Sequence, residues 1–142
     1  MPLKNMLDLR YVSKSITFNG AAGTGAVGAV PIFTVTGEVL ICVLVPFCTT
    51  DLTEGAPTAT LALGVTGSTS LFLAATTATA IDANEFWITT TPPANGFALP
   101  AAFKDIAITD NIIGTVATQS VASGVIRFDL WYLPLSSNGG VV

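Results

Sequence analysis

The sequence VLICVLVPFC, from Val39 to Cys48, is the longest apolar run of the chain, and it is bounded by Glu38 and by Thr49-Thr50-Asp51. A membrane-spanning helix needs about 20 apolar residues, so this run is too short to cross a bilayer. Pro46 and the β-branched residues of the run also disfavour a helix. The run therefore predicts a buried β-strand.

A similar pattern continues along the whole chain of 142 residues. Thr, Val, Ile and Phe dominate the apolar positions, and Gly or Pro interrupts the chain roughly every ten residues, which is typical of an all-β sandwich or barrel. The pattern predicts strands at Ser15–Phe18, Val30–Thr36, Glu38–Phe47, Thr58–Val65, Ser70–Ala75, Glu85–Thr90, Ile112–Gln119 and Gly124–Leu133. We expect a single-domain β-sandwich of about eight strands, either a jelly roll or a related two-sheet topology.

The two ends of the chain and one internal stretch lack a strand pattern. Residues 1–14 are predicted to be an N-terminal arm, residues 15–135 the β-sandwich domain, and residues 136–142 a flexible Ser/Asn/Gly tail. The stretch Thr91–Ile108 contains two prolines and is predicted to be a long loop with one helical turn near Ala101–Lys104.

The composition is 51% hydrophobic and only 10% charged, with a net charge of −4. Disordered chains are poor in apolar residues, so disorder is excluded. Five Lys+Arg against nine Asp+Glu, without a basic cluster, argue against nucleic-acid binding. The N-terminus lacks the apolar stretch of a signal peptide, so we expect a soluble chain without membrane contact. So little charge suggests a surface that neighbours cover in an assembly.

The sequence gives little support for a catalytic, cofactor or metal site. The chain has no histidine, which excludes Ser-His and Cys-His pairs. Gly23–Gly28 spells GxGxxG, but a β-branched run follows where a dinucleotide site needs a helix. Asp82 and Glu85 form one pair of carboxylates and Asp105 and Asp110 another; such pairs could perform glycosidase chemistry or bind calcium, but turn carboxylates are the better interpretation. We predict no enzyme activity, no cofactor and no metal.

The two cysteines are predicted to be free thiols. Cys42 and Cys48 would lie about 20 Å apart on one face of a continuous strand, beyond the reach of a disulfide. A bend at Pro46 could shorten that distance, but their spacing is not that of a redox or zinc motif. Free thiols fit folding in a reducing cytoplasm.

Aromatic residues form another candidate site. Trp87 or Trp131 could serve as a platform for a sugar, but packing in the core or at a subunit interface is the preferred interpretation for Trp87, Trp131 and Tyr132. The stretch Val125–Leu133 is too continuously apolar for a half-exposed strand. It is expected either to be a central strand covered on both sides or to meet a partner with its outer face.

A resemblance rests on four segments between Ser13 and Ser136: SKSITFNGAAGTGAVGAVPIFTVTGEVLI, TATLALGVTG, ATTATAIDANEFWITTTP and IIGTVATQSVASGVIRFDLWYLPLS. In their order and composition they resemble small all-β virion structural proteins of tailed double-stranded DNA bacteriophages, several of which are capsid decoration (cement) proteins. These segments are strand and turn patterns without a catalytic signature, so the resemblance assigns no residue a function.

The resemblance implies a non-enzymatic protein of the capsid surface, made in the host cytoplasm. Such a protein would bind the major capsid protein lattice as an oligomer, with a homotrimer favoured, and stabilise the DNA-filled head. Lys4, Arg10 and Lys14 of the arm could pair with acidic residues of the shell. The alternatives are a tail, fibre or head-spike component that contacts the host, a carbohydrate-binding module, and a hydrolase built on Asp82 and Glu85.

Overall fold

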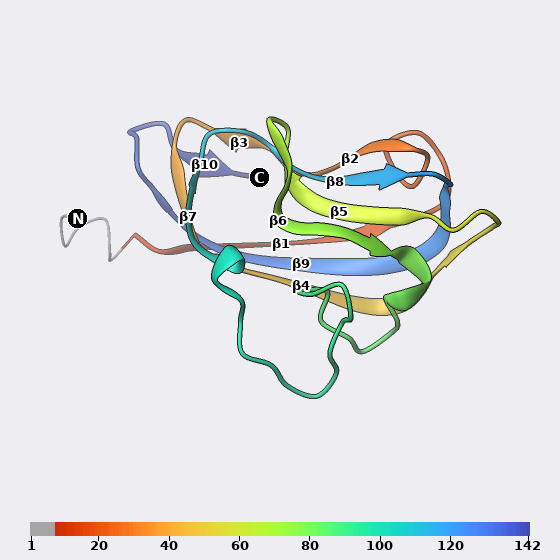
Figure 1. Cartoon of the computed structure of the whole chain (residues 1–142). Helices are drawn as coiled ribbons and strands as arrows, with labels where there is room; N and C mark the ends of the chain where they lie inside the picture. The colour runs from red at the N-terminus through yellow and green to blue at the C-terminus, as the bar shows by residue number, and fades with distance from the viewer. Residues whose placement is uncertain (1–7) are drawn as a thin grey trace.

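A computed structural model describes residues 8–142 of the chain, and it is an all-β sandwich, as predicted (Figure 1). The described residues form ten strands, where about eight were expected, and two single-turn 3-10 helices. The elements are β1 (Arg10–Thr17), β2 (Gly28–Phe33), β3 (Val35–Thr36), β4 (Val39–Glu54), β5 (Thr60–Val65), β6 (Ser68–Thr77), η1 (Ala78–Ala80), η2 (Ala101–Phe103), β7 (Lys104–Ile108), β8 (Ile112–Ala117), β9 (Val121–Pro134) and β10 (Gly140–Val141).

Two four-stranded sheets build the sandwich, and the short strands β3 and β10 pair with each other beside them. One sheet has the order β1-β9-β4-β7 and the other the order β2-β8-β5-β6, with every pairing antiparallel. With β3 and β10 set aside, eight strands remain. The first, eighth, third and sixth form one sheet, and the second, seventh, fourth and fifth form the other, which is the strand order of a jelly roll.

The two longest strands, β4 and β9, lie at the centre of the first sheet. They pair from Val39 opposite Pro134 to Glu54 opposite Val121, with register shifts that bend the pair. Their inward side chains belong to the core that the two sheets enclose: Ile41, Leu44, Cys48, Ile126, Phe128 and Leu130, each at most 1% exposed. The predicted strand at 38–47 is therefore present but extends to Glu54, because β9 continues to pair beyond the Thr49-Thr50-Asp51 boundary.

Both predicted terminal boundaries differ from the structure. Arg10–Thr17 is strand β1, paired with β9 along its full length, so residues 10–14 of the expected arm belong to the sandwich. Val12 and Ile16 face inward and pack against the core. In the expected tail, Gly140–Val141 is strand β10 and pairs with β3. In both cases a distant partner strand supplies hydrogen bonds that no local pattern reveals.

The segment between η1 and β7 differs in part from the prediction. Glu85–Thr90 is not a strand but has isolated bridges, one of them between Phe86 and Phe47. Trp87 from this segment is fully buried, and its indole Nε1 donates a hydrogen bond of 3.0 Å to the buried Thr76 hydroxyl. The predicted helical turn is present as η2, whereas β7 lies in a region expected to be loop.

Gly64 in β5 allows the beginning of β6 to approach closely. A Cβ atom at this position would collide with the backbone of Ser68 and Thr69. A β-bulge lies at the same place, between the Leu63 and Val65 pairings. By contrast, a Cβ at Gly140 in β10 would meet no atom within 4 Å.

We therefore expect Gly64→Ala to destabilise the fold by about 1–3 kcal/mol, since backbone atoms must shift to admit the methyl group. Gly140→Ala is the matched control and should change stability by less than about 0.5 kcal/mol. Urea unfolding midpoints of both variants provide the measurement. Equal midpoints for Gly64→Ala and the unsubstituted chain would contradict the close approach of β6.

Candidate interaction surface

The outer face of the β1-β9-β4-β7 sheet carries apolar and aromatic side chains, which are unusual on a sheet face that contacts solvent. Strand register places Tyr11, Trp131 and Val43 side by side across three strands. The next outward row across the same strands is Ser13, Asp129 and Val45. Antiparallel sheets commonly expose a polar outer face, so the apolar and aromatic members of these rows require an explanation.

An apolar hollow lies at the end of this face where β1 begins. Its volume is about 420 Å³, and it is lined by Leu9, Cys42, Val43, Val45 and Trp131. The rings of Tyr11 and Trp131 stack beside it, with centroids 4.8 Å apart. Leu9 and Tyr11 are 53% and 56% exposed, which is unusual for large apolar and aromatic side chains that have packing partners available.

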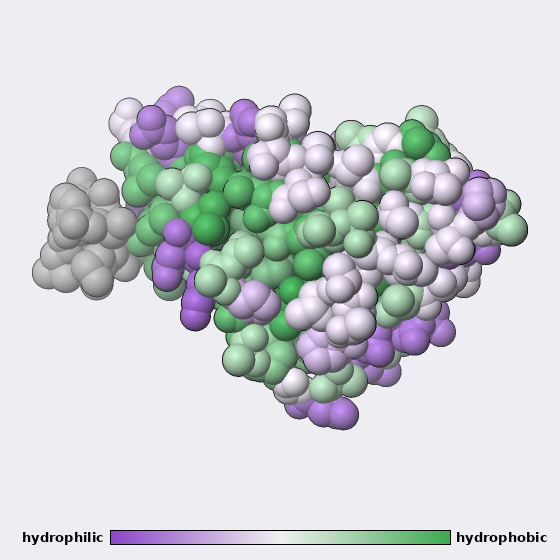
Figure 2. All heavy atoms as spheres, viewed as in Figure 1, coloured by the Kyte–Doolittle hydropathy of each residue, from purple (hydrophilic) through white to green (hydrophobic). Residues whose placement is uncertain are grey.

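Two further hollows open at the same end of the molecule and share Leu135. One, of about 250 Å³, lies between Leu135 and the end of β7 at Ile108. The other, of about 410 Å³, lies between Leu135 and the Asp8–Arg10 segment. Figure 2 shows hydrophobic surface gathered over the end of the sandwich where Figure 1 places β7 and β10.

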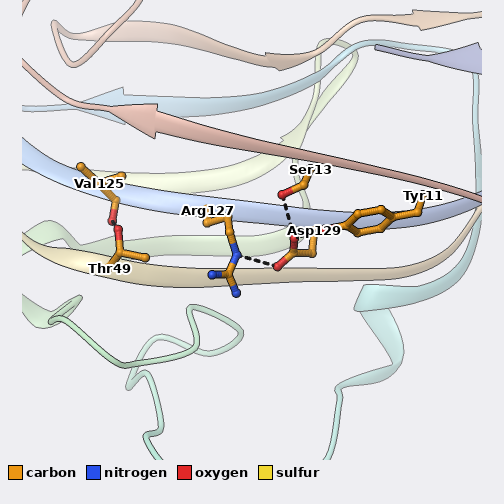
Figure 3. Close-up of polar contacts among 6 residues, drawn as sticks. All are labelled: Tyr11, Ser13, Thr49, Val125, Arg127 and Asp129. Atoms are coloured by element: carbon orange, nitrogen blue, oxygen red, sulfur yellow. Dashed lines mark hydrogen bonds and ion pairs between the residues drawn. The ribbon is translucent and has the colours of Figure 1, made fainter.

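A hydrogen-bond network centred on Asp129 holds β1 to β9 next to the hollow (Figure 3). The Tyr11 hydroxyl donates to the Asp129 carboxylate at 2.7 Å, the Ser13 hydroxyl at 2.8 Å, and the Arg127 Nε at 2.8 Å. Burial alone would raise the pKa of Asp129, but these hydrogen bonds and the Arg127 charge outweigh it and lower the pKa below its usual value. The charged carboxylate thus fixes the position of Tyr11, one half of the aromatic stack.

Aromatic contacts continue the surface along β4. The Arg127 guanidinium lies over the Phe47 ring at 5.2 Å, and Phe47 packs on Phe86 with ring centroids 4.9 Å apart. Phe86 in turn packs on Phe97 at 4.4 Å. These contacts fasten the long segment before η2 to the sheet, which accounts for an ordered loop of unusual length.

Only one of the three predicted interface aromatics lies on a surface. Trp87 is 0% exposed and Tyr132 is 5% exposed, so both belong to the core of this chain. The Tyr132 hydroxyl accepts a hydrogen bond from the Val141 amide and so anchors β10. Of the three, only Trp131 is accessible, so Trp87 cannot serve as a platform for a sugar.

The predicted basic residues do not gather on this face. Lys4 lies outside the described residues. Arg10 and Lys14 alternate with Tyr11 and Ser13 along β1, so they project from the other side of the strand. Arg10 forms an ion pair with Asp8 at 3.0 Å, and the Lys14 ammonium lies 5.6 Å from the centre of the Phe33 ring.

The cysteines and the glycine motif match their predictions. Cys42 and Cys48 are free thiols. Burial raises the pKa of both, that of Cys48 to about 11, and so disfavours the thiolate form of each. Strand β2 begins at Gly28, where a dinucleotide-binding site would require a helix.

Of the carboxylates considered as site residues, Asp82 and Glu85 lie in a turn next to β4. Glu85 accepts a hydrogen bond from the Asp82 amide, and Asp51 accepts one from the Ala83 amide. Within residues 8–142, no three Cys, Asp or Glu side chains are grouped so that they could hold a metal ion. The part of the chain that the structure describes also contains no helix that could span a membrane.

Comparison with known proteins relates this chain by fold only. No protein-family model matches the sequence, and no curated protein matches it. Among solved structures, the chain is similar to a chain of the "Cyanophage Pam1 capsid asymmetric unit", with a TM-score of 0.53 and 17% sequence identity. The overlap covers 89% of this chain and 84% of that one, so the two are of similar length.

Most of this surface is not apparent from local sequence patterns. Leu9, Tyr11 and Ser13 fall in the stretch expected to be an arm, and the continuous apolar run of β4 does not separate its outward residues from its inward ones. Asp129 was not singled out, because the Tyr11 that bonds to it is 118 residues away. One signal was available: Val39–Cys48 is apolar at consecutive positions, so both faces of that strand had to be covered.

The Asp129 network makes stability dependent on pH. Because the pKa of Asp129 is lower in the folded chain, its contribution is present above the ordinary value of 3.8 and is lost as the pH falls through the folded pKa. We expect Asp129→Asn to lose roughly 1–3 kcal/mol of stability at neutral pH and to show a shallower loss in acid. Asp8→Asn, which removes an exposed carboxylate, is the control. Chemical unfolding measured from neutral pH to below pH 3 tests this, and parallel pH profiles for Asp129→Asn and the unsubstituted chain would refute it.

Proposed function

We propose that this chain is a non-enzymatic structural protein of a phage virion, and specifically a capsid decoration protein. The observation that carries the proposal is the jelly-roll fold, which is similar over 89% of the chain to a chain of a phage capsid asymmetric unit. The similar lengths of the two chains support a whole-domain correspondence rather than a shared fragment. The sequence resemblance to decoration proteins points in the same direction.

In this proposal the partner is the lattice of the major capsid protein, and the chain acts as a homo-oligomer, with a trimer favoured. Such a protein works by shape and buried area and needs no titrating catalytic group, which agrees with the absence of histidine. Its place is the outer surface of the capsid, after synthesis in the host cytoplasm. Lys4, Arg10 and Lys14 serve as peripheral charges that pair with acidic shell residues and set the register of docking.

The accessible surface supports an assembly subunit. Leu9, Tyr11 and Leu135 are 40–56% exposed and lie at one end of the sandwich, Leu9 and Tyr11 beside an apolar hollow and Leu135 beside two hollows that also contain charged side chains. Grouped exposure of this kind is typical of a surface that a protein partner covers. The low charge of the chain has the same explanation, because a surface covered by neighbours does not need charge for solubility.

The test compares phage particles that carry the chain with particles from which its gene has been deleted. We expect the deleted particles to release DNA at a lower temperature, and adding back the purified chain to restore the original value, because clamped capsomer junctions resist internal pressure. Release of DNA on heating is followed with an intercalating dye. Full particles that lack the chain and keep their heat resistance would refute the proposal.

Copy number provides an independent check on the same particles. A decoration protein is expected in an amount comparable to the major capsid protein, and quantitative mass spectrometry of purified virions measures that ratio. A ratio of only a few copies per particle would instead favour the tail, fibre or head-spike alternative.

A further inference from the structure

The outer side of β4 is the most unusual surface of the molecule. The six residues Leu9, Tyr11, Cys42, Val43, Val45 and Trp131 form what we call the Leu9–Trp131 surface. Val43 and Val45 point outward while Leu44 between them is fully buried in the core, so β4 is apolar on both faces. A central strand of this kind requires cover on both sides, and the chain itself covers only the inner one at this end.

The residue types of this surface are typical of a contact with another protein. Tyr11 and Trp131 stack against each other, and both residue types are enriched where binding energy concentrates. Asp129 holds the Tyr11 hydroxyl, so this half of the stack is fixed before any partner arrives. A preorganised aromatic pair loses little side-chain freedom on binding.

The charges around the Leu9–Trp131 surface cancel among the described residues. Asp8 pairs with Arg10 at 3.0 Å, and Asp129 pairs with Arg127 at 2.8 Å. Lys104 and Asp105, at the start of β7 beside Val43 and Cys42, are adjacent in sequence and opposite in sign. Charges next to the six residues of the surface are therefore balanced, and Glu38 lies farther along the same end, beside the hollow at Leu135.

The opposite end of the sandwich is acidic. Asp51 and Glu54 lie in the last part of β4, and Asp82 and Glu85 lie in the turn that contacts it. Two copies that met through this end would bring several carboxylates together, and the repulsion between like charges would disfavour that contact. Copies that meet through the Leu9–Trp131 surface, next to which the charges are paired, do not incur this repulsion.

We propose that the Leu9–Trp131 surface is the contact between copies of this chain. The proposal rests on the homo-oligomer proposed above and identifies the face that forms it. A neutral, aromatic and apolar face matches a second neutral, apolar face and gives no electrostatic steering toward a charged partner. The acidic end and Lys14 of β1 remain free for the shell. Trp131 becomes buried between copies, and the hollow beside it receives an apolar side chain of the neighbour.

The decisive experiment uses two matched variants of the full chain. Leu9 and Val27 are 53% and 60% exposed, and each is replaced by aspartate, so both substitutions add the same charge at an exposed apolar position. Val27 lies in the glycine-rich loop, whose Gly25 carbonyl accepts from the Val121 amide at the other end of β9. Sedimentation equilibrium should show an oligomer for the unsubstituted chain and for Val27→Asp. Leu9→Asp should raise the dissociation constant at least about tenfold, since it places an unpaired carboxylate in the contact.

Val45→Asp provides a second variant, and circular dichroism confirms that each variant is folded. The fluorescence of Trp131 gives a further readout, because Trp87 is buried in every state. Dilution should shift the emission of the unsubstituted chain to longer wavelength, and Trp131→Phe should abolish that shift.

Three results would overturn the proposal: a monomer at micromolar concentration, an oligomer unaffected by Leu9→Asp and Val45→Asp, or equal weakening by Val27→Asp. If the chain were a monomer and the Leu9→Asp variant failed to bind phage particles, the surface would contact the shell and not a second copy. These results are distinct from failure of the proposed function, in which the chain would be absent from particles or without effect on them whatever its oligomeric state.

Discussion

The pairing of β4 with β9 is the interaction on which the rest of the structure depends. It runs from Val39–Pro134 to Glu54–Val121 and brings together segments that are far apart in sequence. The inner faces of the two strands supply the centre of the core, and their outer edges receive β1 and β7. The outer faces of the same two strands carry Val43, Val45, Asp129 and Trp131. One strand pair therefore determines both the core and the candidate interaction surface.

The β4–β9 pair also explains why the surface is rigid. Tyr11 could rotate freely at the edge of a sheet, but the Asp129 carboxylate of β9 accepts its hydroxyl hydrogen bond and that of Ser13. Asp129 remains charged because Arg127, two residues along the same strand face, balances it. An ion pair that would contribute little on an open surface here positions an aromatic side chain.

The sequence predicted what local patterns control. Alternation and β-branched residues located β2, β4, β5, β6, β8 and β9 approximately, and glycine and proline located the turns. Strands whose formation depends on a distant partner are predicted only in part: the expected strand from Ser15 covers the end of β1 but not Arg10–Lys14, and the two-residue strand β10 falls in the expected tail. The β-forming neighbours of Trp87 predict a strand there, whereas Trp87 lies outside the strands and its indole donates a hydrogen bond to Thr76 of β6. The Asp129 network joins residues more than a hundred positions apart, which no single-sequence pattern encodes.

The location of the exposed apolar side chains helps to explain how the fold accommodates the unusually hydrophobic composition. A chain that is 51% hydrophobic could have distributed its excess over the whole surface, which would favour unspecific aggregation. Instead, Leu9, Tyr11 and Leu135 lie at one end, while Asp51, Glu54, Asp82 and Glu85 lie toward the other, where Val27 is an isolated exposed apolar side chain. This separation lets like charges keep the acidic ends of neighbouring copies apart while the ends that carry the Leu9–Trp131 surface can approach. Contact at a single end limits growth, because copies that meet around one symmetry axis form a closed oligomer. The same asymmetry thus favours a defined assembly over an open aggregate.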